Sequence, residues 1–263
     1  MSKLTLLNHG PYSIYYSGQT VAPSLLIERL RDARTIEEKG RGGIGLLRVD
    51  DMTLACRKYV HGGLLRAVTG GCFLSSKRAR SEIDITRYLF EAGFPVVEPF
   101  CVIVERRLFA KRLYFLSLFE EGAQDLLDYL AKAGQMARFR AIRRLGQLFF
   151  RLECLGVYHP DLHLNNVLIT RDGKMIFLDF DKSRSGGVSK AEVERMAWRL
   201  MRFAEKMERQ GVITFSLKEK ILFLRTYQRL SGYDILSSME ARAKTKRFTS
   251  RVGWYIEKLL YGK

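Results

Sequence analysis

The chain has 263 residues, of which 47% are hydrophobic, and a formal net charge of +17. This length and composition exclude an intrinsically disordered chain and allow one large domain or two closely packed lobes. The charge predicts a polyanionic partner, which a nucleic acid, an anionic membrane surface or a phosphorylated substrate would each provide, with a solvated basic face as the plain alternative.

The start of the chain and its apolar runs predict neither a targeting segment nor a membrane span. Residues 1–10 contain one lysine and no sustained apolar stretch, so we expect no signal peptide. The longest apolar runs, such as residues 100–104, are too short to cross a bilayer. The four cysteines lack metal-ligand spacing, so we expect reduced, mostly buried thiols of a cytosolic protein and no zinc site.

The first 120 residues predict mainly strands, interrupted by one helix. The helix has Ile83 and Leu89 on one broad apolar face and ends before Gly93 and Pro95, where a helix cannot easily resume. The expected elements are a glycine-rich turn, a strand, this helix and two strands around a basic turn, at residues 40–45, 53–59, 77–92, 102–107 and 113–119.

The second half of the chain predicts mainly helices around one hairpin. Two helices are expected at residues 124–133 and 137–155. A hairpin follows, with strands at residues 167–170 and 175–178 joined by a turn at 171–174. Further helices are expected from residue 190, with breaks near Gly211 and Gly232. The fold class is therefore predicted as α+β. We expect a strand-rich lobe over residues 1–119, a hinge near residues 118–121 and a helical lobe over residues 120–263.

The residues with the clearest chemistry flank the predicted hairpin. Asp161 is followed at a spacing of Asp-x4-Asn by Asn166, and Asp179 ends the second hairpin strand. Phosphoryl transfer needs a carboxylate that orients and deprotonates a hydroxyl, and oxygen ligands that hold magnesium on the phosphates. A loop and a hairpin that bring these three side chains together would supply both.

These residues resemble the catalytic core of the protein-kinase-like superfamily. His159-x-Asp161-x4-Asn166 is similar to its catalytic loop, and Asp179-Phe180 to its metal-binding Asp-Phe motif. The resemblance implies a two-lobed kinase fold that uses ATP and Mg²⁺, with Asp161 as catalytic base and Asn166 and Asp179 as magnesium ligands. It also implies that His159 braces the loop instead of acting as a base.

Upstream residues follow the same plan, with one departure. Glu82, on the predicted helix, is placed as the glutamate that pairs with a strand cation, and that cation is here Arg57 or Lys58 instead of the superfamily's lysine. Strand alternation allows only one of the two to point inward, and the register favours Arg57, which can bind phosphate in a bidentate manner. The nucleotide-covering loop would contain Gly40, Gly42, Gly43 and Gly45.

Two further departures concern the acceptor. Pro160 replaces the arginine that reads activation-loop phosphorylation, and only a few residues separate Asp181 from the helix that starts near Ser189. A long activation segment and an Ala-Pro-Glu motif are missing, so the usual peptide-docking platform is absent from this sequence. A small hydroxylated acceptor is therefore favoured over a protein.

A narrower resemblance concerns the kinases of 3-deoxy-D-manno-octulosonic acid (Kdo). Arg57-Lys58-Tyr59-Val60-His61-Gly62-Gly63 is similar to their Arg-x-Tyr-x-x-Gly-Gly signature, and the likeness extends from about Gly40 to Leu178-Asp179-Phe180-Asp181-Lys182. The resemblance implies transfer of the ATP γ-phosphate to a sugar hydroxyl of Kdo–lipid A. It also implies a cytoplasmic protein held peripherally at the cytoplasmic face of the inner membrane, with an anionic glycolipid acceptor that would account for the positive charge.

Several alternatives stay open at this point. The acceptor could be another small molecule or a protein, and a kinase-fold protein could bind polyanions without catalysis. Nucleic-acid binding rests on charge alone, and no nucleic-acid motif is present, so we expect none. Asp181 could assist the metal or the acceptor, or it could cap the turn that follows it. For His163, solvent exposure is favoured over contact with the acceptor.

Overall fold

The structure is a computed structural model that describes residues 4–32, 34–36, 44–61, 71–242 and 244. They form a mixed α+β fold, which confirms the predicted class. The chain divides into two compact units: unit 1 is Met1–Leu126, His159–Asp161 and Asn165–Gly186, and unit 2 is Leu127–Tyr158, Leu162–Leu164 and Gly187–Lys263. Unit 1 is rich in strands and unit 2 in helices, and the lobe boundary at residues 119/120 stays a prediction.

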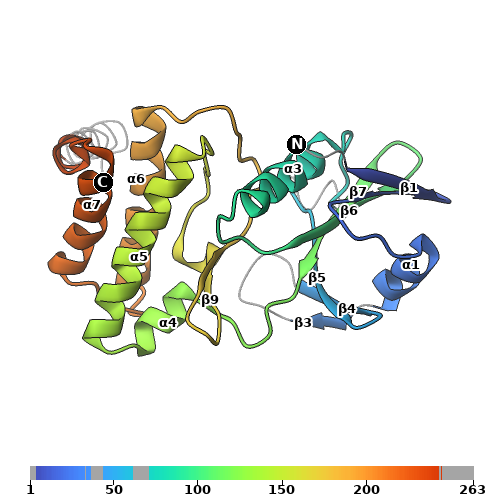
Figure 1. Ribbon diagram of the computed structural model, residues 1–263, viewed down its shortest axis with the longest axis horizontal. Coiled ribbons are helices and arrows are strands. Elements are labelled where there is room, and N and C mark those ends of the chain that lie inside the picture. The colour runs from blue at the N-terminus through green and yellow to red at the C-terminus, as the bar shows by residue number, and fades with distance from the viewer. Residues whose placement is uncertain (1–3, 33, 37–43, 62–70, 243, 245–263) are drawn as a thin grey trace, which may run out of the picture. The chain divides into compact units, whose positions relative to one another are not determined.

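The largest element of unit 1 is a seven-stranded antiparallel sheet with the order β1-β2-β6-β7-β5-β4-β3 (Figure 1). Its strands are β1 (Thr5–His9), β2 (Tyr12–Tyr16), β3 (Arg34–Ile36), β4 (Ile44–Val49), β5 (Met52–Lys58), β6 (Pro99–Arg106) and β7 (Lys111–Leu118). The strands predicted at residues 53–59, 102–107 and 113–119 are confirmed as β5, β6 and β7. β5 lies between β4 and β7, which fixes the direction of each of its side chains.

Two helices cover opposite faces of this sheet. Along β6, Cys101 and Ile103 belong to the core that contains Leu26 of α1 (Pro23–Asp32), whereas Val102 joins the core that contains Ile83 of α3 (Lys77–Glu91). Successive side chains of a strand point to opposite faces, so the two cores lie on the two sides of the sheet. The helix predicted at residues 77–92 is confirmed as α3, but α1 lies where mainly strands were expected.

A second, three-stranded sheet of unit 1 carries the predicted hairpin. Its strands are β8 (Gln124–Asp125), β9 (Val167–Ile169) and β10 (Met175–Phe177), and β9 and β10 confirm the expected hairpin. The helix expected from residue 124 begins only at α4 (Leu126–Lys132), because Gln124 and Asp125 pair with β9. The Phe177 backbone N–H donates to the carbonyl oxygen of Pro95 over 2.9 Å, which anchors β10 within unit 1.

Unit 2 consists mainly of α5 (Gln135–Cys154), α6 (Lys190–Arg209) and α7 (Leu217–Ser231). The rings of Phe149 and Phe223 meet edge to face at 5.3 Å between α5 and α7, and a side chain at Gly146 would collide with Thr226. Capping boxes begin both α6 and α7, which satisfies their first backbone N–H groups. The predicted helix breaks are confirmed, because α6 ends just before Gly211 and α7 ends at Gly232.

The cysteines and the helices also bear on the sequence predictions. All four cysteines are free thiols: Cys56 and Cys101 are buried, Cys72 is partly buried and Cys154 is exposed. The expected burial therefore holds for two of them. None of the helices that the structure describes combines the length and the apolar character that crossing a bilayer requires.

Candidate active site

The loop between α5 and β9 is held in place by a buried histidine. Gly156 turns the chain out of α5 with φ of 68°, a left-handed conformation that glycine adopts without strain. His159 is fully buried, and its Nε2 lies within hydrogen-bond distance, 3.1 Å, of the Leu178 carbonyl oxygen, while its ring packs 4.8 Å from that of Phe180. The expected structural role of His159 is therefore confirmed.

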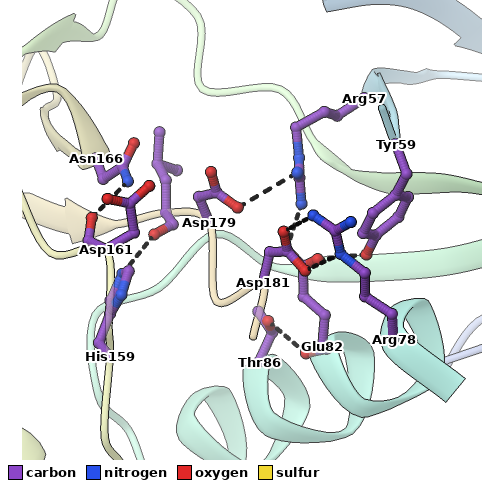
Figure 2. Close-up of polar contacts among 11 residues, drawn as sticks. Arg57, Tyr59, Arg78, Glu82, Thr86, His159, Asp161, Asn166, Asp179 and Asp181 are labelled. Carbon is purple, nitrogen blue, oxygen red and sulfur yellow. Dashed lines mark hydrogen bonds and ion pairs between the residues drawn. The ribbon is translucent and has the colours of Figure 1, made fainter. Parts of the chain in front are cut away.

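Two hydrogen bonds to backbone carbonyl oxygens bring the three predicted catalytic side chains together. Asn166 Nδ2 donates to the carbonyl oxygen of Asp161 over 3.0 Å. The backbone N–H of Leu178 donates to the carbonyl oxygen of Asn166 over 2.9 Å, so Asp179, the next residue, starts beside Asn166. Figure 2 shows Asp179 between the Asp161–Asn166 pair on one side and Arg57 on the other. All four residues belong to unit 1.

Asp179 has an uncommon backbone conformation. Its φ of 59° lies in the left-handed region, which costs most residues other than glycine about 1–3 kcal/mol and is best tolerated by Asp and Asn. The conformation holds Asp179 Oδ1 at 3.3 Å from Arg57 Nη1. Oδ1 is shielded from solvent, yet it accepts no hydrogen bond from the part of the chain that the structure describes.

This environment fits a magnesium ligand. A buried carboxylate oxygen without a hydrogen-bond donor is costly unless another positive partner approaches it. The described residues contain no group of three or more His, Cys, Asp or Glu side chains able to hold a metal by themselves. Magnesium commonly takes one or two protein oxygens and completes its shell with water and substrate phosphates, and Asp179 with the Asn166 amide oxygen could supply that number.

Arg57 is the cation at the centre of the site. It lies on the opposite face of β5 from the buried side chains of Leu54 and Cys56. Its Nη2 donates to Glu82 Oε1 over 2.5 Å, and its guanidinium lies 4.8 Å from the centre of the Tyr59 ring. Burial lowers the pKa of Arg57, but the carboxylates of Glu82 and Asp179 outweigh it, so the pKa is raised and the positive charge is secure.

Glu82 is a buried carboxylate that depends on its partners. Its side chain is 1% exposed, and its other oxygen, Oε2, accepts a hydrogen bond from the hydroxyl group of Tyr59. Burial raises the pKa of Glu82 to about 7, and the charge of Arg57 opposes that rise. Burial and the neighbouring Glu82 also raise the pKa of Tyr59, so its phenol stays protonated and can donate.

Asp181 has a partner that neither sequence interpretation included. Both of its carboxylate oxygens accept hydrogen bonds from Arg78, which lies on α3 one turn before Glu82. Figure 2 shows this pair beside the one formed by Arg57 and Glu82. The side chains of Arg78 and Asp181 are 25% and 13% exposed, so the pair is partly withdrawn from water. The structure therefore gives Asp181 an ion pair with Arg78, a role that lies outside the two alternatives left open by the sequence, a metal or acceptor contact and a turn cap.

We expect Asp181→Asn to lower the free energy of unfolding by about 1–3 kcal/mol, because it leaves Arg78 without a charged acceptor. Urea denaturation of this variant, of Arg78→Gln and of the double variant measures the coupling between the two side chains. The double variant should lose clearly less than the sum of the single variants. Strictly additive losses, accompanied by a collapse of turnover in Asp181→Asn alone, would instead favour a direct role with metal or acceptor.

The other sequence-predicted residues lie as follows. Lys58 is exposed, on the opposite side of β5 from Arg57. Gly45 lies in β4, where it pairs with Cys56, instead of in a turn. The remaining glycines of the two glycine-rich motifs lie outside the described residues: Gly40, Gly42, Gly43, Gly62 and Gly63.

His163 corrects a further expectation. It was expected to be exposed, but within unit 2 it is partly buried and stacks on Phe203 at 4.6 Å, with 11° between the ring planes. The partner lies on α6, far along the chain, so local sequence could not reveal it. The stacking gives His163 a packing role.

Two residues of the site did not emerge from the sequence as site residues, although each had a detectable signal. Tyr59 follows Arg57 by two positions and therefore faces the same side of the strand. Arg78 precedes Glu82 by four positions and therefore lies on the same side of α3. Both guanidinium groups lie over the Tyr59 ring, at 4.8 Å for Arg57 and 5.5 Å for Arg78.

Comparison with known proteins gives one consistent result. The sequence profile described as "Lipopolysaccharide kinase (Kdo/WaaP) family" matches residues 28–227. Among curated proteins, the 3-deoxy-D-manno-octulosonic acid kinase of Mannheimia succiniciproducens is 30% identical over 204 residues, which cover 72% of this chain and 82% of that protein. The kinase of the same name from Pasteurella multocida is 33% identical over 155 residues, covering 55% of this chain and 64% of that protein.

The extent of these matches differs among the relatives. The 3-deoxy-D-manno-octulosonic acid kinase of Xanthomonas oryzae pv. oryzae is 30% identical over 154 residues, which are 57% of this chain. That match spans 61% of the relative's own length. The profile match includes β5, α3 and the whole segment from His159 to Asp181, so it contains every described residue of the candidate site.

Proposed function

The chain belongs to the lipopolysaccharide kinase (Kdo/WaaP) family, and from that premise we propose that it transfers the γ-phosphate of ATP to a sugar hydroxyl of Kdo in the lipopolysaccharide inner core. One observation carries the proposal beyond family membership. Asp161, Asn166, Asp179 and Arg57 gather within unit 1, and they supply a carboxylate base, two oxygen ligands and a cation. These are the groups that phosphoryl transfer requires.

In the proposed mechanism Asp161 is the general base. Its carboxylate accepts the proton of the acceptor hydroxyl as the oxygen of that hydroxyl attacks the γ-phosphorus, and the bond from phosphorus to the bridging oxygen of ADP breaks. Asn166 Nδ2 donates to the Asp161 backbone carbonyl, which fixes the backbone of the loop that carries the proposed base. Arg57 holds the triphosphate through its guanidinium, and we propose that the segment with Gly40, Gly42 and Gly43 covers the nucleotide.

Asn166 and Asp179 are the proposed magnesium ligands. Magnesium, when bound, neutralises the charge that develops on the phosphate oxygens. Asp179 Oδ1 suits this role because it is buried and faces the Arg57 guanidinium at 3.3 Å without accepting a hydrogen bond from the described residues. Glu82 holds Arg57 in place, so it acts on the nucleotide only through Arg57.

The proposed acceptor and location agree with the charge of the chain. Kdo–lipid A is an anionic glycolipid, and a chain with a net charge of +17 is attracted to it and to an anionic membrane. We propose that the protein acts from the cytoplasm, peripherally at the cytoplasmic face of the inner membrane. Each basic residue close to such a surface contributes about 1 kcal/mol.

The direct test is ATP turnover by the purified protein with Kdo–lipid A, with and without magnesium. We expect ADP to form together with a phosphorylated acceptor, and only when magnesium is present. Mass spectrometry of lipid A–core from a deletion strain should show the loss of one phosphate. Turnover with a different sugar or small molecule, and none with Kdo–lipid A, would keep the kinase assignment and overturn the acceptor.

Removal of the proposed metal ligand has a distinct expected result. Asp179→Asn should raise the magnesium concentration for half-maximal turnover at least about tenfold. Loss of a side chain that only hydrogen-bonds a metal ligand already lowers metal affinity or activity roughly 10- to 100-fold, and Asp179 is proposed to be a ligand itself. A magnesium titration of turnover measures this shift. Asp51→Asn changes an exposed carboxylate of the same unit and should leave the titration unchanged. Identical magnesium curves for Asp179→Asn and the unmodified protein would contradict the assignment.

A further inference from the structure

The turn between β6 and β7 exposes two large apolar side chains. Leu108 is 95% exposed and Phe109 is 90% exposed, at the tip of a turn that the hydrogen bond from Arg107 N to Ala110 O closes over 2.8 Å. Figure 1 shows this turn, in green, at the end of the two strands. Single exposed apolar side chains are common on protein surfaces, but two adjacent ones at a protruding tip contribute nothing to the core.

A third exposed apolar side chain lies against the same hairpin. Phe73 and Lys111 exchange two backbone hydrogen bonds of 2.7 Å, which attaches the segment before α3 to the start of β7. The next residue, Leu74, is 86% exposed. Leu74 and Ala110 line one open cavity of about 920 Å³, whose apolar wall is completed by Phe73. The apolar surface is therefore continuous from the hairpin base into this cavity.

Basic side chains line the cavity and precede the hairpin tip. Lys77, Arg78 and Lys182 line the cavity, and among the described residues that line it none is a carboxylate. Lys77 and Lys182 are exposed, whereas Arg78 is engaged by Asp181. Arg106 and Arg107, both exposed, precede the apolar tip of the hairpin, where Arg107 pairs with Glu105 over 2.9 Å. Exposed apolar side chains with cations beside them are the pattern of a surface that enters the interface of an anionic bilayer.

We propose that this surface, formed by Leu74, Leu108, Phe109 and the cation-lined cavity, docks unit 1 onto an anionic lipid bilayer. Leu108 and Phe109 enter the region between headgroups and acyl chains, and Lys77 and Lys182 bind lipid phosphates. The inference rests on the proposed function in so far as a glycolipid acceptor brings the protein to a membrane. The positive charge of this surface favours an anionic bilayer over a second copy of the chain, because a second copy would bring the same positive charges together.

Another basic groove of the protein provides the control. It lies between α5 and α7 in unit 2, has a volume of about 620 Å³, and is lined by Arg143, Lys218, Arg225 and Arg229. Leu217, at the start of α7, is 71% exposed. This region carries positive charge and an exposed leucine without the protruding apolar tip, so it separates the effect of the hairpin from that of charge in general.

The test is co-sedimentation of the full chain with vesicles of phosphatidylethanolamine and phosphatidylglycerol, compared with phosphatidylcholine vesicles. Leu108→Ser/Phe109→Ser should weaken binding to the anionic vesicles at least about tenfold, because two apolar side chains no longer leave water. Lys77→Gln should weaken it about fivefold. The controls Leu217→Ser and Arg225→Gln should stay within about twofold of the unmodified protein. Equal binding by the hairpin variant and the unmodified protein overturns the proposal.

Activity measurements separate this inference from the proposed function. With a soluble, deacylated Kdo acceptor, the hairpin variant should turn over ATP at the unmodified rate, and only turnover on vesicle-borne acceptor should fall. If no acceptor is phosphorylated but the hairpin variant still loses vesicle binding, the docking surface stands and the proposed function fails. A dimer that the hairpin substitutions dissociate, without any binding to anionic vesicles, overturns docking in favour of self-association.

Discussion

Asp161→Asn should lower turnover with Kdo–lipid A by about 10²–10⁴-fold, the usual contribution of a general base. Asparagine has nearly the same shape as aspartate but cannot accept the proton of the acceptor hydroxyl at neutral pH. The contact that fixes the loop survives, because Asn166 donates to the backbone carbonyl of residue 161 and not to its side chain. We therefore expect the fold and the binding of the magnesium–nucleotide complex to persist while the chemical step fails.

Three measurements on the same sample distinguish loss of the chemical step from loss of nucleotide binding or of the fold. Steady-state turnover should fall, whereas the affinity for a fluorescent ATP analogue and the thermal unfolding midpoint should change little. Asp172→Asn removes an exposed carboxylate from the β9–β10 turn and should leave turnover unchanged. Near-normal turnover by Asp161→Asn would count against catalysis at this site and favour a kinase-fold protein that binds polyanions.

Local sequence predicted those parts of the site that depend on periodicity. The alternation of β5 favoured Arg57 over Lys58 as the inward side chain, and Arg57 is the one that contacts Glu82. The same alternation places Tyr59 on the side of Arg57, and the helical repeat of α3 places Arg78 on the side of Glu82, so both positions could have been predicted. The hairpin of β9 and β10 followed from its turn residues and apolar strands.

Other features depend on contacts that no local pattern encodes. Asp181 and Arg78 are separated by 103 positions, and only the folded chain brings them together. Gln124 and Asp125 have helical neighbours, but pairing with β9 places them in a strand. The helix α1 begins at Pro23, and proline is a favoured first residue of helices. This single residue was not enough to predict a helix in a part of the chain where mainly strands were expected.

The second large effect is expected on stability, at the ion pair of Arg57 and Glu82. Arg57→Met should lower the free energy of unfolding by about 3 kcal/mol, because Glu82, which is 1% exposed, is left without its cation. Asp179 also loses the guanidinium that lies 3.3 Å from its Oδ1. Urea denaturation measures the loss, and Lys58→Met, a change of the exposed neighbouring residue, should alter stability by about 0.5 kcal/mol at most.

The dependence of this loss on pH identifies Glu82 as its source. The pKa of Glu82 in the folded protein is about 7, above its ordinary value of 4.5, so its contribution to stability is complete at low pH and declines as the pH rises through about 7. Arg57 opposes that rise, so its removal raises the pKa of Glu82 further. The destabilisation by Arg57→Met should therefore be larger at about pH 8 than at about pH 6, where the protonated carboxyl needs no cation.

A compensating substitution decides whether the ion pair or the arginine alone determines stability. Arg57→Met/Glu82→Leu removes both charges, and replacement of a buried pair by apolar side chains is often neutral, so it should recover most of the stability lost in Arg57→Met. It should also remove the difference between about pH 6 and about pH 8. Turnover should stay low, because the double variant lacks the cation that we propose holds the triphosphate. A double variant as unstable as Arg57→Met would show that Arg57 stabilises unit 1 through Tyr59 and Asp179 instead of through Glu82.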